Sequence, residues 1–179
     1  AILDSQQEKV VFIGYSFNGI AVSRMPELRP KKIDRLVYLM AFLLNNGASF
    51  YVTVQGVPDS KAVEHFFLSD DKTQDFVKLE EIQNAFAHDI PAEAFNKAKA
   101  YIITEPLAPL GYKHEVTDTV FGKTPKYYIE CIADRAIPMS AQWSMYQGKV
   151  KSVFTLNSIH IPNFSQPDKL AAILLEVIQ

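Results

Sequence analysis

A serine lies between an apolar run and a helical pattern, and this arrangement constrains the fold more than any other part of the chain. The apolar run is VVFI at 10–13, the turn is GYSFNG at 14–19, and the helical pattern follows at 20–25. A strand that turns sharply into a helix needs small flanking residues and pushes a serine at its apex out of the sheet. The segment therefore predicts an accessible hydroxyl on Ser16 at a strand-to-helix turn.

Size and composition indicate one globular domain with a sizeable core. The chain has 179 residues, of which 48% are hydrophobic and 21% charged, with a net charge of −2. This charge gives no electrostatic reason to expect nucleic acid or an anionic membrane surface. No stretch reaches the roughly 18 uncharged apolar residues of a membrane helix, and residues 1–4 do not start a signal peptide. We therefore expect neither nucleic acid nor a membrane as a partner.

The single cysteine, Cys131, excludes an intrachain disulfide. It lies in the apolar run at 127–132, where a buried small hydrophobe is favoured over a reactive thiol. A chain without disulfides suits a reducing compartment, so we expect a cytoplasmic location.

Strand and helix patterns alternate along most of the chain. The expected strands are 9–14, 33–42, 126–132 and 150–156; the expected helices are 1–8 (last turns only), 16–25 (ended by Pro26), 139–147 and 167–178. Such alternation predicts a parallel sheet. The near-continuous apolar run in 33–42 is typical of a parallel strand covered on both faces.

Residues 45–118 differ from this pattern, because they are richer in charge and in aromatic residues. Apolar residues recur at helical spacing in 69–88, and a second helix is expected at 92–100. We interpret 45–118 as a helical insertion, with the core formed by 1–44 and 119–179.

Three residue types suited to nucleophilic catalysis follow expected strands in the order serine, acid, histidine. Ser16 follows the first strand, Asp134 follows 126–132 and His160 follows 150–156. An imidazole can take the proton of a serine hydroxyl, and a carboxylate holds that imidazole in the right tautomer. Because the carboxyl ends of parallel strands meet at one edge of a sheet, the three loops are expected to converge. This chemistry needs no metal and no organic cofactor.

Each of these residues also has a structural interpretation. Ser16 could only cap a helix, Asp134 could form a surface ion pair with Arg135, and His160 could be a hydrogen-bonded structural histidine. Their shared order and placement favour the catalytic interpretation. The other histidines, His65, His88 and His114, fall in the insertion and are interpreted as surface or packing residues.

Four segments resemble the hydroxynitrile lyase and plant methylesterase branch of the α/β-hydrolases and its bacterial esterase relatives. They are VVFIGYSFNGIAVSRMPELRPKKIDRLVYLMAFL, YYIECIADRAIPMSAQWSMY, SIHIPNFSQPDKLAAILLEVI and, more loosely, FAHDIPAEAFNKAKAYIITEPLAPL. The resemblance implies an α/β-hydrolase fold, with a mostly parallel sheet, helices on both faces and a helical cap. It also implies that Ser16 is the nucleophile, Asp134 the acid and His160 the base, with the backbone N–H of Phe17 as one oxyanion donor.

The chain departs from this family at several positions. Tyr15 stands where the family usually has histidine, Asn18 where it has glycine, and Leu44 where proline is common. Asn18 is expected to crowd the helix behind the turn. Ile161 follows the histidine at the position where the lyases of the branch carry a lysine that handles cyanide. This uncharged residue favours an esterase over a lyase.

The expected function is therefore hydrolysis of a small carboxylic ester through an acyl-enzyme. A hydroxynitrile-type lyase on the same residues and a non-catalytic small-molecule-binding protein are the alternatives. The expected partner is a small-molecule ester, and a homodimer is left open. Phe50, Tyr51, Phe66, Phe67, Phe76 and Phe86 would suit an apolar substrate group, although aromatic residues at this spacing are more often core than pocket.

The resemblance also implies that several strands precede the turn in family members, whereas this chain starts just ahead of it. Strand 9–14 is then expected to lack a neighbour on one side and to expose an apolar edge. The oxyanion hole would keep only its Phe17 donor. On this interpretation the chain alone is expected to be poorly soluble and nearly inactive.

Overall fold

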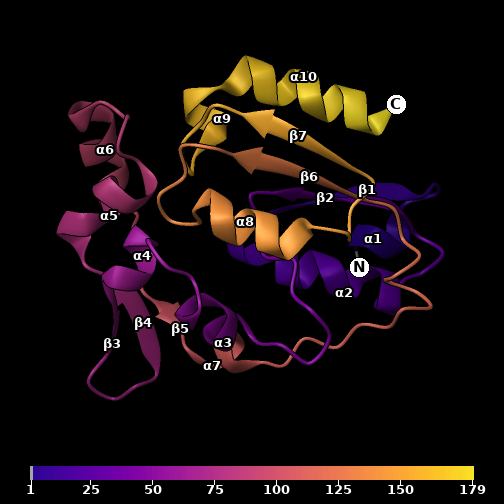
Figure 1. The fold of residues 1–179 in the computed structure, drawn as a ribbon, viewed down its shortest axis with the longest axis horizontal. Helices are drawn as coiled ribbons and strands as arrows, with labels where there is room; N and C mark the ends of the chain where they lie inside the picture. Colours follow the sequence, from indigo (N-terminus) through magenta and orange to yellow (C-terminus); the bar gives the residue numbers. More distant parts are fainter. Residues whose placement is uncertain (1) are drawn as a thin grey trace.

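A four-stranded parallel sheet forms the centre of the computed structural model, which describes residues 2–179 (Figure 1). Its strands lie in the order β1 (Val10–Tyr15), β2 (Ile33–Leu39), β6 (Lys126–Cys131) and β7 (Ser152–Leu156). The register pairs Tyr15 with Leu39, Leu39 with Ile129, and Cys131 with Leu156. The carboxyl ends of all four strands therefore lie at one edge, and the predicted parallel α/β architecture is confirmed.

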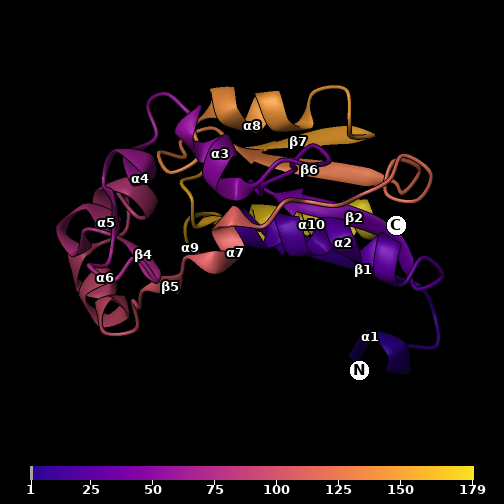
Figure 2. The same ribbon diagram turned by 90° about the horizontal axis from the view of Figure 1, so that it is seen from below.

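Helices cover both faces of this sheet (Figures 1 and 2). One buried cluster joins Tyr38 of β2 to Val22 of α2 (Gly19–Leu28) and Met145 of α8 (Met139–Tyr146). A second cluster joins Val37 of β2 to Leu170 of α10 (Pro167–Ile178). Because successive side chains of a strand point to opposite faces, the run from Leu36 to Leu39 of β2 must be apolar, as its sequence indicated.

The ends of α2 and β2 differ from the prediction. Helix α2 does not stop at Pro26 but includes it and continues to Leu28. Strand β2 ends at Leu39 rather than at residue 42, because Met40 has a φ of 33° and turns the chain. Residues 40–44 stay buried behind this turn, so their apolar character reflects burial and not strand structure.

The insertion lies beside the carboxyl edge of the sheet, at the left of Figure 1. It holds α3 (Phe50–Gln55), α4 (Lys61–Glu64), α5 (Leu79–Phe86), α6 (Ala92–Lys99) and α7 (Ala108–Gly111). It also holds an antiparallel sheet of β3 (Phe66–Leu68), β4 (Gln74–Val77) and β5 (Glu105–Pro106). We call this insertion the cap; its exact limits at 45 and 118 stay a prediction.

The cap sheet corrects the helix expected at 69–88. Only Leu79–Phe86 is helical, and the residues before it form the β3–β4 hairpin. The hairpin turn explains the difference, because Asp71 accepts hydrogen bonds from the Ser69 hydroxyl and the Thr73 backbone, and Lys72 has a φ of 56°. Such local side-chain bonds favour a turn over a helix.

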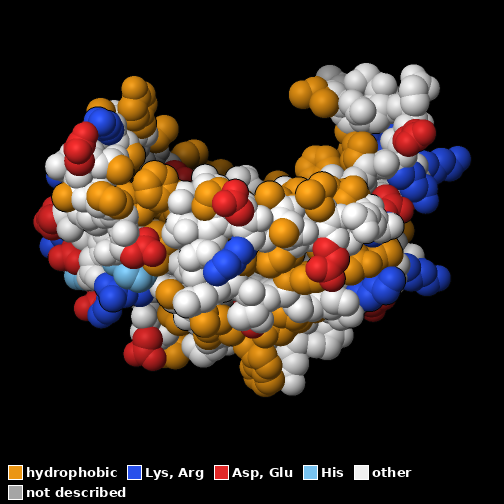
Figure 3. All heavy atoms as spheres, turned by 90° about the horizontal axis from the view of Figure 1, so that it is seen from above, with side chains coloured by type: hydrophobic (Ala, Val, Ile, Leu, Met, Phe, Trp, Pro, Cys, Tyr) orange, Lys and Arg blue, Asp and Glu red, His pale blue; other side chains and the backbone are white. Residues whose placement is uncertain are grey.

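Short helices complete the described chain: α1 (Ile2–Ser5), the 3₁₀ turn η1 (Ser16–Asn18) and α9 (Pro162–Ser165). Helix α1 projects from the body beside the edge strand β1 (Figure 2). Figure 3 shows apolar side chains along the hollow between α1 and the cap, and Ile13 of β1 is 41% exposed. Within residues 2–179, no helix has both the length and the apolar character needed to cross a membrane.

Candidate active site

Ser16 lies at the apex of the turn between β1 and α2, in a strained backbone conformation. Its φ is 52°, in the left-handed region that non-glycine residues rarely adopt. Such a conformation costs on the order of 1–3 kcal/mol and persists only where the surroundings enforce it. The Ser16 carbonyl accepts a hydrogen bond from the Phe42 N–H at 3.0 Å, which ties the turn to the segment after β2. The N-cap positions are held by Tyr15 for η1 and by Asn18 for α2, and the Ser16 hydroxyl is bonded to His160, so Ser16 is not a helix cap.

Two glycines allow the tight approach behind this turn. A Cβ on Gly14 would lie 3.0 Å from the Gly19 Cα, and one on Gly19 would lie 2.5 Å from the Phe42 carbonyl oxygen. Asn18, by contrast, is exposed and has helical dihedral angles, φ −64° and ψ −11°. Asn18 therefore does not crowd the helix as expected, and the close-packing position is occupied by Gly19.

Gly19→Ala is expected to destabilise the protein by about 1–3 kcal/mol, because the new methyl group would overlap backbone that cannot yield without moving the turn. Urea denaturation, followed by circular dichroism, measures the change. Gly111→Ala is the matched control, since a Cβ there meets nothing within 4 Å. Equal midpoints for the two variants would contradict this account of the turn.

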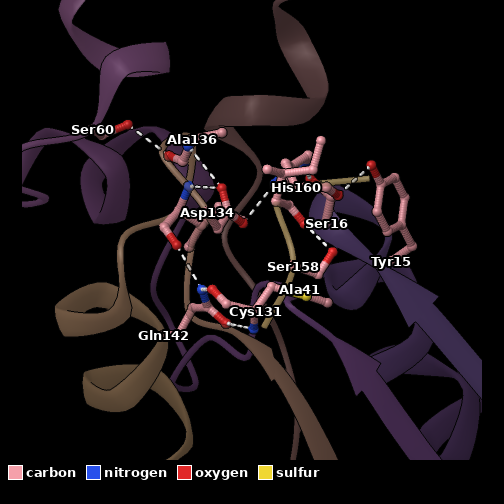
Figure 4. Close-up of polar contacts among 12 residues, drawn as sticks. Tyr15, Ser16, Ala41, Ser60, Cys131, Asp134, Ala136, Gln142, Ser158 and His160 are labelled. Carbon is pink, nitrogen blue, oxygen red and sulfur yellow. Dashed lines mark hydrogen bonds and ion pairs between the residues drawn. The ribbon is translucent and has the colours of Figure 1, made fainter. Parts of the chain in front are cut away.

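The structure brings Ser16, His160 and Asp134 together in one hydrogen-bonded chain (Figure 4). His160 Nδ1 lies 2.8 Å from Asp134 Oδ2, and His160 Nε2 lies 3.0 Å from Ser16 Oγ. An ionised carboxylate can only accept, so the Nδ1–H donates to Asp134 and Nε2 is left to accept from the serine hydroxyl. His160 and Asp134 are buried, whereas Ser16 is half-buried and reaches the cavity. This arrangement can activate a serine.

The loop of Asp134 fixes the orientation of its carboxylate. Asp134 Oδ1 accepts the backbone N–H groups of Ala136 at 2.8 Å and Ile137 at 2.9 Å, which leaves Oδ2 for His160. The buried Gln142 side chain holds the loop in place. Its amide oxygen accepts the Cys131 backbone N–H, and its NH₂ group donates to the carbonyls of Cys131 and Ile137. Asp134 is therefore not a partner of Arg135 in a surface ion pair.

Residues 133–138, which we call the acid loop, are also bonded to the cap. The Ser60 hydroxyl donates to the Ala136 carbonyl at 2.7 Å, and the Lys61 N–H donates to the Arg135 carbonyl at 2.8 Å. The Arg135 guanidinium donates to Asn84 of α5 at 2.8 Å. These contacts place α4 and α5 directly against the loop that carries Asp134.

Tyr15 and Phe86 position the histidine, and sequence reasoning assigned neither of them this role. The Tyr15 hydroxyl donates to the His160 carbonyl at 3.0 Å, and its ring lies 5.4 Å from the imidazole. Burial, and then the charge of Asp134, raise the pKa of Tyr15 well above its usual value, so it stays a neutral donor. The Phe86 ring packs edge-on at 5.1 Å. The unusual Tyr15 beside the serine was the one available signal.

A cavity of about 290 Å³ lies between the core and the cap. The core contributes Ser16, Phe17 and His160 to its lining. Four of the six cap aromatics named above also line it: Phe50, Phe66, Phe76 and Phe86. These four are therefore pocket residues, although Phe50 also packs against the core cluster, whereas Tyr51 and Phe67 are 38% exposed on the surface.

Phe17 follows the serine in η1. The first N–H groups of a helical turn have no partner within it, so the Phe17 N–H is available to a negatively charged oxygen formed next to Ser16. Among the side chains of residues 2–179, no three histidine, cysteine or acidic residues are grouped closely enough to hold a metal ion.

The remaining histidines and the cysteine lie outside this arrangement. His65 lies 3.5 Å from Glu81, and His114 is fully buried against the Phe121 ring. His88 contributes nothing to the cavity lining. Cys131 is buried, and burial raises the pKa of its thiol to about 12, as expected for a packing residue.

A parallel sheet with helices on both faces, a cap over its carboxyl edge and a serine–histidine–aspartate chain on the loops define the α/β-hydrolase fold. Comparisons with solved structures agree. A pyrethroid hydrolase from Sphingobium faniae JZ-2 superposes with a TM-score of 0.85 at 26% identity, over 98% of this chain and 72% of that one. The Arabidopsis methylesterase MES16 superposes with a TM-score of 0.82 at 20% identity, over 99% of this chain and 73% of that one.

The chain is a homologue of plant methylesterases and of a bacterial pyrethroid hydrolase. It is 27% identical to the pyrethroid hydrolase of Sphingobium wenxiniae over 95% of this chain, and 26% identical to methylesterase 7 of Arabidopsis thaliana over 98%. It spans about half the length of the first curated relatives that it matches, between 41% and 64%. No protein-family model matches it.

Proposed function

We propose that this protein hydrolyses small carboxylic esters through a covalent acyl-serine. The observation that carries the proposal is the hydrogen-bonded chain from Ser16 through His160 to Asp134, which ends in a largely apolar cavity. The names of the relatives support an ester substrate, since they are methylesterases and a pyrethroid hydrolase.

In the proposed mechanism Ser16 Oγ attacks the ester carbonyl while His160 Nε2 takes its proton. Asp134 keeps the imidazole oriented and stabilises the imidazolium that forms. The Phe17 N–H donates to the oxyanion. His160 then gives the proton to the leaving alcohol, and a water molecule hydrolyses the acyl-serine by the same steps.

A cyanohydrin lyase on the same residues is disfavoured by Ile161. This residue follows His160 and is half-buried, and it offers no charge to a cyanide leaving group. A non-catalytic binding protein is disfavoured, because binding alone does not require a strained serine that is hydrogen-bonded to a histidine. A cytoplasmic location and a homodimer stay predictions.

A fluorophosphonate probe, applied to the full-length protein, tests the proposal, because it reacts with an activated serine. We expect stoichiometric labelling of the peptide that contains Ser16, measured by mass spectrometry, together with turnover of p-nitrophenyl acetate. Ser16→Ala should lose both. Labelling at another serine in the wild-type protein, or turnover without labelling, would contradict the assignment of the nucleophile.

A further inference from the structure

One carboxyl group is buried in the cap against the cavity without a partner. Asp75 of β4 lines the cavity and is only 8% exposed. Its Oδ2 atom is buried and has no hydrogen-bond partner among residues 2–179. A buried acceptor without a partner is costly, and most such groups in native proteins have a donor. This orphaned oxygen can therefore accept a hydrogen bond from a donor that enters the cavity.

A second carboxyl group stands beside it. Glu105 of β5 pairs directly opposite Asp75 in the antiparallel register and also lines the cavity. Like charges at such positions repel each other and destabilise the sheet. The third strand, β3, contributes only Phe66, Phe67 and Leu68, so it offers no compensating charge.

No cation of the lining balances these two acids. His160 is the one basic side chain among the described lining residues, and its two ring nitrogens are already used. Burial, and then the charge of Glu105, raise the pKa of Asp75 to about 6. Asp75 is thus mostly ionised at neutral pH, and its buried charge lowers the stability of the protein when no ligand is bound.

We propose that Asp75 binds a protonated amine of the substrate, so that the cavity selects esters that carry one ammonium group away from the reacting carbonyl. An ammonium group supplies both the missing donor and the missing positive charge. The aromatic side chains of Phe66, Phe76 and Phe86 line the same cavity. They suit the apolar body of such an ester, and the faces of their rings attract a cation. Among residues 2–179, no group of three histidine, cysteine or acidic side chains could hold a metal ion, which favours an amine over a metal at Asp75.

This inference rests on the proposed ester hydrolysis, and it is tested with two matched esters. Methyl 4-(aminomethyl)phenylacetate carries an ammonium group, whereas methyl 4-ethylphenylacetate has nearly the same shape without the charge. We expect kcat/KM near neutral pH to favour the charged ester by a factor of about 10 to 100, as a charge-assisted hydrogen bond provides. Product formation is measured by chromatography.

Variants assign the preference to one residue. Asp75→Asn should bring the ratio of the two kcat/KM values close to one, whereas Glu93→Gln, which changes an exposed cap carboxylate on α6, should keep it. The wild-type ratio should also fall as the pH is lowered below about 6, because Asp75 then takes up a proton. The ratio cancels any pH dependence of the reaction itself, which acts on both esters alike.

A binding measurement separates this inference from the hydrolysis itself. Calorimetry on Ser16→Ala gives the affinity for both esters without turnover, and the double variant with Asp75→Asn should lose the preference. If neither ester is hydrolysed but Ser16→Ala still prefers the charged one, the proposed hydrolysis fails and the amine site stands. Equal affinities for the two esters, or an Asp75→Asn variant that weakens both alike, would overturn the amine site.

Discussion

Ser16→Ala is expected to lower kcat for p-nitrophenyl acetate by about 10⁴–10⁶ while the fold is retained. Alanine keeps the Cβ and can occupy the same strained backbone, so the Phe42 bond to residue 16 stays possible. What is lost is the oxygen that His160 activates, and the serine, histidine and acid act as a unit. Initial rates measure the effect, and thermal melting by circular dichroism checks the fold.

The matched control is Ser140→Ala, because Ser140 is exposed on α8 and does not line the cavity. It should keep the wild-type rate. If Ser16→Ala hydrolysed the ester within tenfold of that rate, the nucleophile would have to be another group.

Asp134→Asn is expected to cost about 10⁴ in kcat. The asparagine Oδ1 can still accept the two backbone N–H groups of the acid loop, so the loop should keep its shape. Its NH₂ group then faces His160 Nδ1 and donates to it, which forces the imidazole proton onto Nε2. A histidine in that tautomer cannot accept the proton of Ser16.

His160→Ala should cost at least as much as Asp134→Asn, because it removes the base altogether. Asp59→Asn, which neutralises an exposed aspartate that does not line the cavity, should leave the rate unchanged. A wild-type rate in Asp134→Asn would show that another group orients the histidine. Glu130 cannot replace Asp134, since its two oxygens accept from Tyr146 and Thr155.

The sequence placed Ser16, Asp134 and His160 together because the rule that joins them is topological. Each follows a strand of a parallel sheet, and such strands end at one edge, so the order of the elements predicts proximity without any coordinates. Burial on both faces likewise followed from the continuous apolar run of β2.

The cap was harder to predict for a physical reason. Strands β3 and β4 have only three and four residues, too few for an alternating pattern to stand out against a helical one. Because 69–78 was expected to be helical, the sequence predicted neither the pairing of Asp75 with Glu105 nor the position of Asp75 in the cavity lining. Tyr15 was visible as a departure from the family, but its bond to His160 joins residues 145 positions apart. No local pattern encodes that contact.

The bonds between the cap and the acid loop have a mechanical consequence. A lid that swings freely must be joined to the core only by its hinges, yet here Ser60, Lys61 and Asn84 all hold the segment that aims the carboxylate of Asp134. Any displacement of α4 or α5 would therefore pull on the acid and misalign the imidazole. Substrates are therefore expected to enter through a permanent opening of the cavity and not through movement of the cap. The cap then affects the reactivity of the site as well as its shape.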